Sequence, residues 1–177
     1  MNRMSTLYID KVKTDIWSGF LVVSEDGLAY VSHYTKDLHD VSNWQSKFYP
    51  NSILVSDSKK VSLYKKQFEE YLAGKRYSFD FPVDLKGTSF QKEVWNALLT
   101  IPYGQTASYL DIAHQLDRDF KSAQAIGGAV SANPLSIAYP CHRIVGEDGS
   151  LTGYAGGLEI KKKLLNHELE HAFKIKN

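Results

Sequence analysis

The chain has one cysteine, Cys141, in the stretch "YPCHR". An unassisted thiol has a pKa of about 8.5, so only a few per cent of it is thiolate at neutral pH. A nearby histidine that accepts the proton, and that is itself oriented by a carboxylate, makes a thiol a usable nucleophile. His142 and Glu168 are residues of the types that this relay needs. We interpret Cys141 as a nucleophile, against the alternative that it is a small buried hydrophobe.

The sequence leaves the geometry of this relay open. Adjacent residues on a strand point to opposite faces, so His142 cannot face Cys141 directly if the segment is extended. Either the chain turns after Pro140, or a water molecule bridges the two side chains.

Glu168 falls on the inward face of the helix expected over residues 158–173, in the same row as Ile160 and Leu164. A carboxylate on that face is costly to bury unless it has a partner. Either Glu168 is half-exposed, or a histidine such as His142 pairs with it.

The composition is that of an ordinary globular protein, with 177 residues of which 43% are hydrophobic and 23% charged. No apolar run approaches the roughly 18 residues of a membrane span, and the first residues lack the apolar core of a signal peptide. A single cysteine cannot form an internal disulfide. We therefore expect a cytoplasmic protein without a membrane segment. The formal net charge of +1 does not by itself indicate a nucleic-acid partner.

The first part of the chain predicts a small sheet with a helix, forming a domain over residues 1–85. Strands are expected in 6–12 and 19–34, with Asp26 and Gly27 at a hairpin turn. The pattern of 57–76 is helical and ends at Gly74. A further strand is expected over 76–87, leading into a linker.

The second part, residues 86–177, is expected to be mainly helical, which makes the whole chain α/β (α+β). Capping boxes are predicted at Thr88 with Gln91 and at Ser108 with Asp111. Two short helices around a polar turn near residue 118 favour a helix-turn-helix. The second of them is rich in alanine and glycine, which indicates close packing against another helix or close approach to a nucleic-acid backbone.

Three segments, "IPYGQTASY", "QAIGGAVSANP" and "PCHRIVG…GSLTGYAGGL", follow one another in the second part. In this order they resemble the O6-alkylguanine-DNA alkyltransferases, also called methylated-DNA–protein-cysteine methyltransferases. The resemblance covers about residues 80–170 and extends more weakly over the N-terminal part.

The resemblance implies DNA repair by direct reversal of damage. An alkyl group moves from guanine O6 to Cys141, once per molecule, and inactivates the protein irreversibly. The implied partner is double-stranded DNA, bound in the minor groove with the alkylated guanine flipped out of the stack. The chain is expected to act as a monomer without a cofactor. Activity on O4-alkylthymine and the preference among alkyl groups are left open.

The resemblance also implies roles for individual residues. Cys141 is the acceptor, His142 a base that acts through a water, Glu168 the group that orients His142, Tyr109 the donor to the leaving guanine, and Asn133 the residue that holds the active-site turn. The substrate pocket is assigned to Tyr154, Ala155, Gly156, Ile144, Ser136 and Val130, and DNA contact to Gln124, Ala123, Gly127, Ala129 and Ser122. Arg143 is expected to tether the two lobes.

The sequence departs from the family pattern at three of these positions. Gln124 stands where many relatives have an arginine that fills the space of the flipped base, which predicts intact chemistry with weaker flipping or DNA affinity. Ala155 and Ser136 replace a serine and a proline of some relatives. No metal is expected, because His33 and His39 are too few for a closed zinc site.

Three other functions are compatible with parts of the pattern. A sensor that binds alkylated bases without repairing them belongs to a related group that lacks the cysteine, which this chain has. A cysteine hydrolase or acyltransferase would have no use for a helix-turn-helix. A transcriptional regulator that senses alkylation would need additional domains and N-terminal cysteines. Alkyl transfer is therefore the favoured function.

Overall fold

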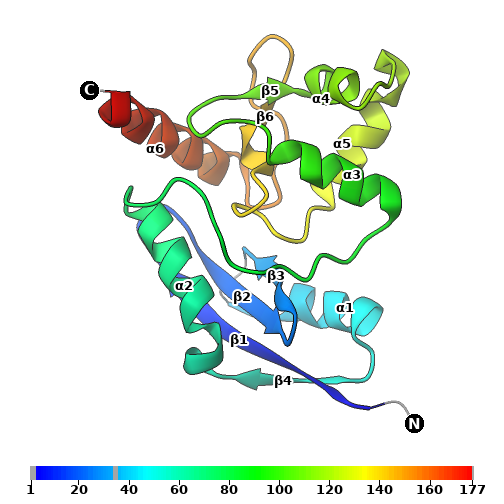
Figure 1. The fold of residues 1–177 in the computed structure, drawn as a ribbon, viewed down its shortest axis with the longest axis vertical. Helices are drawn as coiled ribbons and strands as arrows, with labels where there is room; N and C mark the ends of the chain where they lie inside the picture. Colours follow the sequence, from blue (N-terminus) through cyan, green and yellow to red (C-terminus); the bar gives the residue numbers. More distant parts are fainter. Residues whose placement is uncertain (1–2, 34–35, 177) are drawn as a thin grey trace. The chain divides into compact units, whose positions relative to one another are not determined.

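The computed structural model describes residues 3–33 and 36–176, and the chain divides into two compact units, Met1–Lys86 and Gly87–Asn177. The first unit holds a sheet and two helices, and the second is mainly helical (Figure 1). The fold is therefore mixed α+β, which confirms the predicted class. None of the helices in the described ranges combines the length and the apolar character needed to cross a membrane.

The sheet of the first unit has the strand order β3-β2-β1-β4. Its strands are β1 (Ser5–Lys13), β2 (Ser18–Ser24), β3 (Gly27–Ser32) and β4 (Ser52–Ser56). Neighbours β1, β2 and β3 pair antiparallel, and β4 pairs parallel with β1. The hairpin between β2 and β3 lies where Asp26 and Gly27 predict it, and Gly27 supplies the positive φ of 146°.

Two helices cover opposite faces of this sheet. Helix α1 (His39–Phe48) packs Trp44 in a core cluster with Leu7 and Ile9 of β1. Helix α2 (Ser58–Leu72) places Lys60 over the Tyr8 ring and pairs Lys65 with Asp10. Residues 7 and 9 alternate with 8 and 10 along the strand, so the two helices lie on different sides.

The strand expected over residues 76–87 is not formed. Val83 makes only an isolated bridge to Leu28, and Pro82 has no amide hydrogen to extend a ladder. The alternating aromatic residues, which suggested a strand, instead pack on α2: Phe79 and Phe81 lie 5.2 and 6.2 Å from Phe68 between ring centroids.

The second unit carries eight elements within residues 87–176. They are α3 (Ser89–Leu98), β5 (Ala107–Ser108), α4 (Tyr109–Gln115), the 3-10 turn η1 (Phe120–Ser122), α5 (Ala123–Ser131), the 3-10 turn η2 (Cys141–Arg143), β6 (Ile144–Val145) and α6 (Leu158–Lys176). Both predicted capping boxes form, at the start of α3 and of α4. Strands β5 and β6 pair parallel, which joins the start of α4 to the segment that follows Cys141.

Candidate active site

The turn that leads into Cys141 is strained and is held by one side chain. Ile137 has φ of 76°, a left-handed conformation that is a genuine outlier for a β-branched residue. Asn133 fixes the turn from inside: its Nδ2 donates to the Tyr139 carbonyl at 2.8 Å, and its Oδ1 accepts from the Leu135 amide at 3.0 Å. This is the placement that the predicted positioning role of Asn133 requires.

The chain turns after Pro140, because residues Cys141–Arg143 form the 3-10 turn η2. This is one of the two geometries that the sequence left open. The Cys141 side chain is 6% exposed, and it lines a cavity of about 260 Å³. The Cys141 thiol lies 3.8 Å from the Ser136 Oγ.

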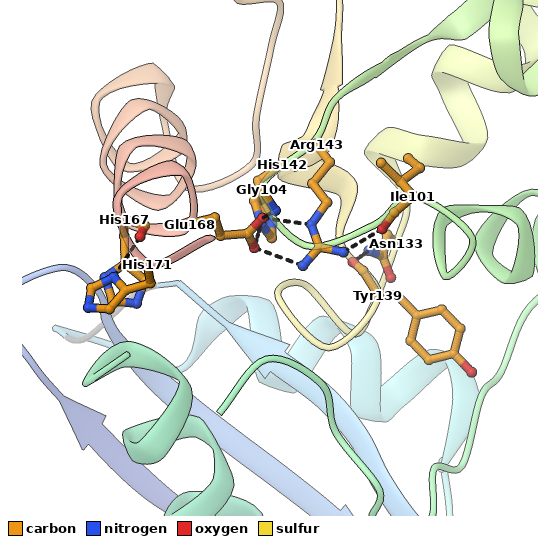
Figure 2. Close-up of polar contacts among 9 residues, drawn as sticks. All are labelled: Ile101, Gly104, Asn133, Tyr139, His142, Arg143, His167, Glu168 and His171. Atoms are coloured by element: carbon orange, nitrogen blue, oxygen red, sulfur yellow. Dashed lines mark hydrogen bonds and ion pairs between the residues drawn. The ribbon is translucent and has the colours of Figure 1, made fainter. Parts of the chain in front are cut away.

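Behind the cysteine, Glu168 of α6 is wholly buried and fully engaged (Figure 2). Its carboxylate contacts His142 Nε2 at 2.7 Å and accepts from Arg143 Nε and Nη2 at 2.8 and 2.9 Å. The Gly104 amide donates to it at 3.2 Å. A side chain at residue 104 would bring its Cβ within 2.6 Å of the Cβ of Ala172, so glycine is needed for this approach. Glu168 is therefore a buried carboxylate with partners, not a half-exposed one.

The contacts that the structure shows for the Arg143 side chain lie within the second unit. Besides Glu168, its guanidinium donates to the Ile101 carbonyl at 2.7 Å, and both residues belong to the second unit (Figure 2). A cation is needed at this position because a buried carboxylate requires one. The sequence could not show this, since the carboxylate lies 25 residues away along the chain.

The charges of this cluster decide which member is protonated. Burial opposes ionisation of Glu168, but the hydrogen bonds and charges of His142 and Arg143 hold its pKa well below the usual range. Burial lowers the pKa of His142 even though Glu168 raises it. His142 is therefore a neutral imidazole at pH 7, able to accept a proton while Glu168 stabilises the resulting cation.

Burial raises the pKa of the Cys141 thiol, and three neighbours counter part of this effect: Asn133, Ser136 and Lys161. The resting form at neutral pH is the thiol. Reaction therefore requires that the proton leaves as the sulfur attacks, which is the task of a base.

Lys161 of α6 is a site residue that the sequence reasoning missed. It is wholly buried, and its Nζ donates to the carbonyls of Thr152 and Gly153 at 3.1 and 3.5 Å. A pattern could have found it. Lys161 precedes Leu164 by three residues and Glu168 by seven, so it shares their inward row.

The cavity gathers six of the predicted site residues, namely Cys141, Asn133, Ser136, Val130, Tyr154 and Ala155, and adds Ser131 and Gly153. Ile144 and Gly156 do not line it. Ile144 is fully buried and pairs with Ala107 of β5, so it supports the site from behind. The hydroxyl oxygen of Tyr154 is buried, and this burial raises the pKa of the tyrosine well above its usual value.

Tyr109 also lies outside the cavity lining, at the first position of α4. Its hydroxyl is 3.0 Å from Thr152 Oγ1, and its ring is within 3.8 Å of where a Cβ on Gly127 of α5 would be. Tyr109 therefore lies between the proposed DNA-facing helix and the loop that walls the cavity.

Helix α5 exposes only part of the predicted DNA-contacting set. Gln124 is exposed, and Ser122, Ala123 and Gly127 are half-exposed. The assignment of Ala129 is not supported: it is 4% exposed, and its carbonyl accepts from Trp95 Nε1 of α3 at 2.7 Å. The neighbouring exposed position is Gly128, where an added Cβ would meet nothing within 4 Å.

Among the residues that the structure describes, no three histidine, cysteine, aspartate or glutamate side chains are grouped so that they could hold a metal ion. His33 accepts from Trp17 Nε1 at 2.9 Å, and His39 contacts Asp37.

Comparison with known proteins places this site in a family. The family described as "6-O-methylguanine DNA methyltransferase, DNA binding domain" matches residues 89–170. An inducible methylated-DNA–protein-cysteine methyltransferase of Bacillus subtilis is 43% identical over 163 residues, which cover 92% of this chain and 90% of the relative.

Solved structures agree with the sequence relatives. The crystal structure of the Mycobacterium tuberculosis O6-methylguanine methyltransferase superposes with a TM-score of 0.81 at 33% identity, over 97% of this chain and 99% of that one. The same organism's OGT in complex with DNA gives 0.78 at 34% identity, over 94% of each chain. This chain belongs to the family of the methylated-DNA–protein-cysteine methyltransferases.

Proposed function

We propose that this chain repairs DNA by moving an alkyl group from O6 of an alkylated guanine to the sulfur of Cys141. The observation that carries the proposal is the placement of one buried thiol against a cavity, with a neutral His142 beside it in the chain and a fully ionised Glu168 behind that histidine. The relatives named above act on methylated DNA or O6-methylguanine.

The reaction is a displacement at the alkyl carbon. The bond from carbon to Cys141 sulfur forms as the bond from carbon to guanine O6 breaks. The thiol proton passes through a water molecule to His142, whose cation Glu168 stabilises. The departing guanine needs a proton, for which Tyr109 is the proposed donor. The proton taken up by His142 is then released to solvent, and Tyr109 regains a proton from solvent. With both residues restored, the net result is that the alkyl group and the thiol proton have exchanged places.

The proposed reaction occurs once per molecule. The product is a thioether, whose carbon–sulfur bond offers no good leaving group. Free thiol is therefore not regenerated, and the protein is consumed in proportion to the damage that it repairs.

Because Cys141 is only 6% exposed, a guanine that stays in the stack cannot bring its O6 alkyl group to the sulfur, so the base must leave the duplex. Helices α4 and α5 are the proposed helix-turn-helix, with α5 in the minor groove. The open space beside Gly128 supports this placement, because it lets the backbone come close to DNA. A monomer and a cytoplasmic location are also proposed. The second is supported by the single cysteine, which forms no disulfide.

The test is incubation with a duplex that carries one O6-methylguanine, followed by intact and peptide mass spectrometry. We expect one methyl group on the peptide that contains Cys141, stopping at one equivalent, and no gain in Cys141→Ser. Unmodified Cys141 together with retained binding to the damaged duplex would instead support a sensor. Release of free product in repeated cycles would support a hydrolase.

A further inference from the structure

A large aromatic side chain stands exposed at the start of the proposed DNA-facing helix. Phe120, in η1, is 70% exposed, although most phenylalanine side chains in a folded domain are buried. It precedes Gln124 by four residues and Gly128 by eight, and both of these are exposed as well. Phe120 therefore lies in the turn that leads into α5, about one turn before Gln124, and all three positions are exposed.

The turn that presents Phe120 is braced. Asp119 caps it, because its Oδ1 accepts from the Lys121 amide at 3.0 Å and its carbonyl accepts from the Ser122 amide at 3.0 Å. On the other side, the Arg118 amide donates to the Ala113 carbonyl at 2.8 Å.

The side chain of Arg118 adds a second brace, this time to α3. Its Nη2 donates to Glu93 at 3.2 Å, and its guanidinium lies 4.8 Å from the centroid of the Phe90 ring. The backbone of the turn is therefore fixed, and it presents the Phe120 side chain to solvent.

The charges around Phe120 are mixed. Asp117, Arg118, Asp119 and Lys121 carry two negative and two positive charges, so the turn itself is not an electropositive patch. The apolar ring is the feature that would gain from contact. Apolar side chains pack against base steps in proteins that bind the minor groove, and rings stack on bases in a sequence-tolerant manner.

We propose that Phe120 is a further DNA-contacting residue, whose ring packs against the sugar and base surface of the duplex about one helical turn from Gln124. The inference rests on the proposed function of the chain and adds an apolar contact to it. The added contact would lie near Gln124, which brings no charge and less stacking than arginine.

The experiment compares Phe120→Ala with a matched control. Phe173 of α6 is also 70% exposed, so Phe173→Ala removes an equally exposed ring from a different element. Binding to an undamaged fluorescent duplex is measured by anisotropy at several salt concentrations. We expect Phe120→Ala to weaken binding about 5-fold or more, Phe120→Tyr to bind like the unmodified chain, and Phe173→Ala to have no effect.

The salt dependence identifies the kind of contact. Loss of an apolar contact lowers affinity without changing the slope of log K against log salt concentration. Removal of a phosphate contact lowers that slope by about 1. Equal affinities of Phe120→Ala and the unmodified chain would overturn the proposal, and so would a changed slope.

Two substrates separate this inference from the proposed function. Phe120→Ala should transfer methyl more slowly from duplex DNA at subsaturating protein, and at an unchanged rate from the free base O6-methylguanine. An equal loss on both would mean that Phe120 acts on the cavity and would overturn the inference. If the unmodified chain takes no methyl from either, the proposed function fails, whatever the binding of Phe120→Ala.

Discussion

Burial makes the Cys141 thiol harder to ionise, and it keeps His142 neutral and therefore able to accept a proton. The pKa of Cys141 is raised because its thiolate would be poorly solvated, while that of His142 is lowered for the same reason. Both residues therefore rest uncharged at neutral pH. The cysteine and the histidine thus carry no charge until the reaction creates one, and the buried charges around them belong to Glu168, Arg143 and Lys161.

The buried charge of Lys161 should be measurable in the pH profile. Lys161→Met keeps the length of the side chain and removes the charge that lowers the pKa of Cys141. We expect alkyl transfer at pH 7 to slow, because the pKa of Cys141 rises when this charge is removed, and to recover at higher pH. The rate is measured against pH with free O6-methylguanine. Lys162→Met, an exposed neighbour, is the control. A loss that is equal at every pH would show that Lys161 only anchors the loop.

The carboxylate of Glu168 should matter for stability as well as for rate. Glu168→Gln removes the anion from a guanidinium that is 7% exposed, and it leaves Arg143 with a buried, uncompensated charge. We expect the free energy of unfolding, measured with urea, to fall by about 3 kcal/mol. We also expect alkyl transfer to be slower. Glu170→Gln, whose carboxylate is exposed and contacts Lys174, should change neither. A stable but slow Glu168→Gln protein would contradict the stability argument.

At the scale of elements, the glycines of α5 lower the stability of the helix and leave its surface without side chains at those positions. Glycine in a helix interior costs about 1 kcal/mol relative to alanine, and no atom of the described residues lies within 4 Å of where a Cβ on Gly128 would be. Gly128→Ala should therefore raise thermal stability and weaken binding to duplex DNA, if that space is where DNA approaches. Transfer from the free base should be unchanged. Stabilisation without any loss of DNA affinity would place the DNA elsewhere.

The elements that the sequence predicts best are those with local chemistry. The capping boxes at Thr88 and Ser108 and the stop at Gly74 depend on residues a few positions apart, and all three form. Helix α1 and strand β4 were not predicted, because their positions depend on the rest of the sheet. The segment around Phe79 alternates apolar and polar residues as a strand does, but it packs on α2. Such alternation shows which side chains are buried and does not show whether the backbone pairs with another strand.

At the site, too, the sequence predicts what depends on local residues and motifs and misses what depends on contacts between distant segments. Residue types and family motifs predicted Cys141, His142 and Glu168, which the structure brings to one place. They could not predict that Arg143 pairs with Glu168, that the Lys161 ammonium donates to the loop at Thr152, or that Trp95 donates to the carbonyl of a buried Ala129. Each of these depends on contacts between segments that are distant in sequence.

At the scale of the whole molecule, a half-buried histidine lies in the first unit, which contains none of the proposed catalytic residues. His33 accepts a hydrogen bond from Trp17 Nε1, and its ring meets that of Trp17 edge-on at 5.9 Å. Burial lowers the pKa of His33 to about 4, although the charge of Asp40 opposes this. The neutral ring is needed because a protonated one cannot accept the tryptophan hydrogen bond.

This histidine should make stability depend on pH. Its folded-state pKa of about 4 lies below the ordinary 6.5, so the unfolded chain binds the proton more readily. Its stabilising contribution is complete above pH 6.5 and is lost progressively as the pH falls toward 4, by about 2 kcal/mol at pH 5. His33→Gln keeps an acceptor for Trp17 but cannot take up this proton. Between pH 7 and pH 5, its free energy of unfolding should fall by about 2 kcal/mol less than that of the unmodified chain. The measurement is urea unfolding followed by tryptophan fluorescence. His39→Gln removes an exposed histidine whose pKa is raised by Asp37, so it should not reduce the loss on acidification. An unchanged pH dependence in His33→Gln would mean that His33 is not buried as a neutral ring.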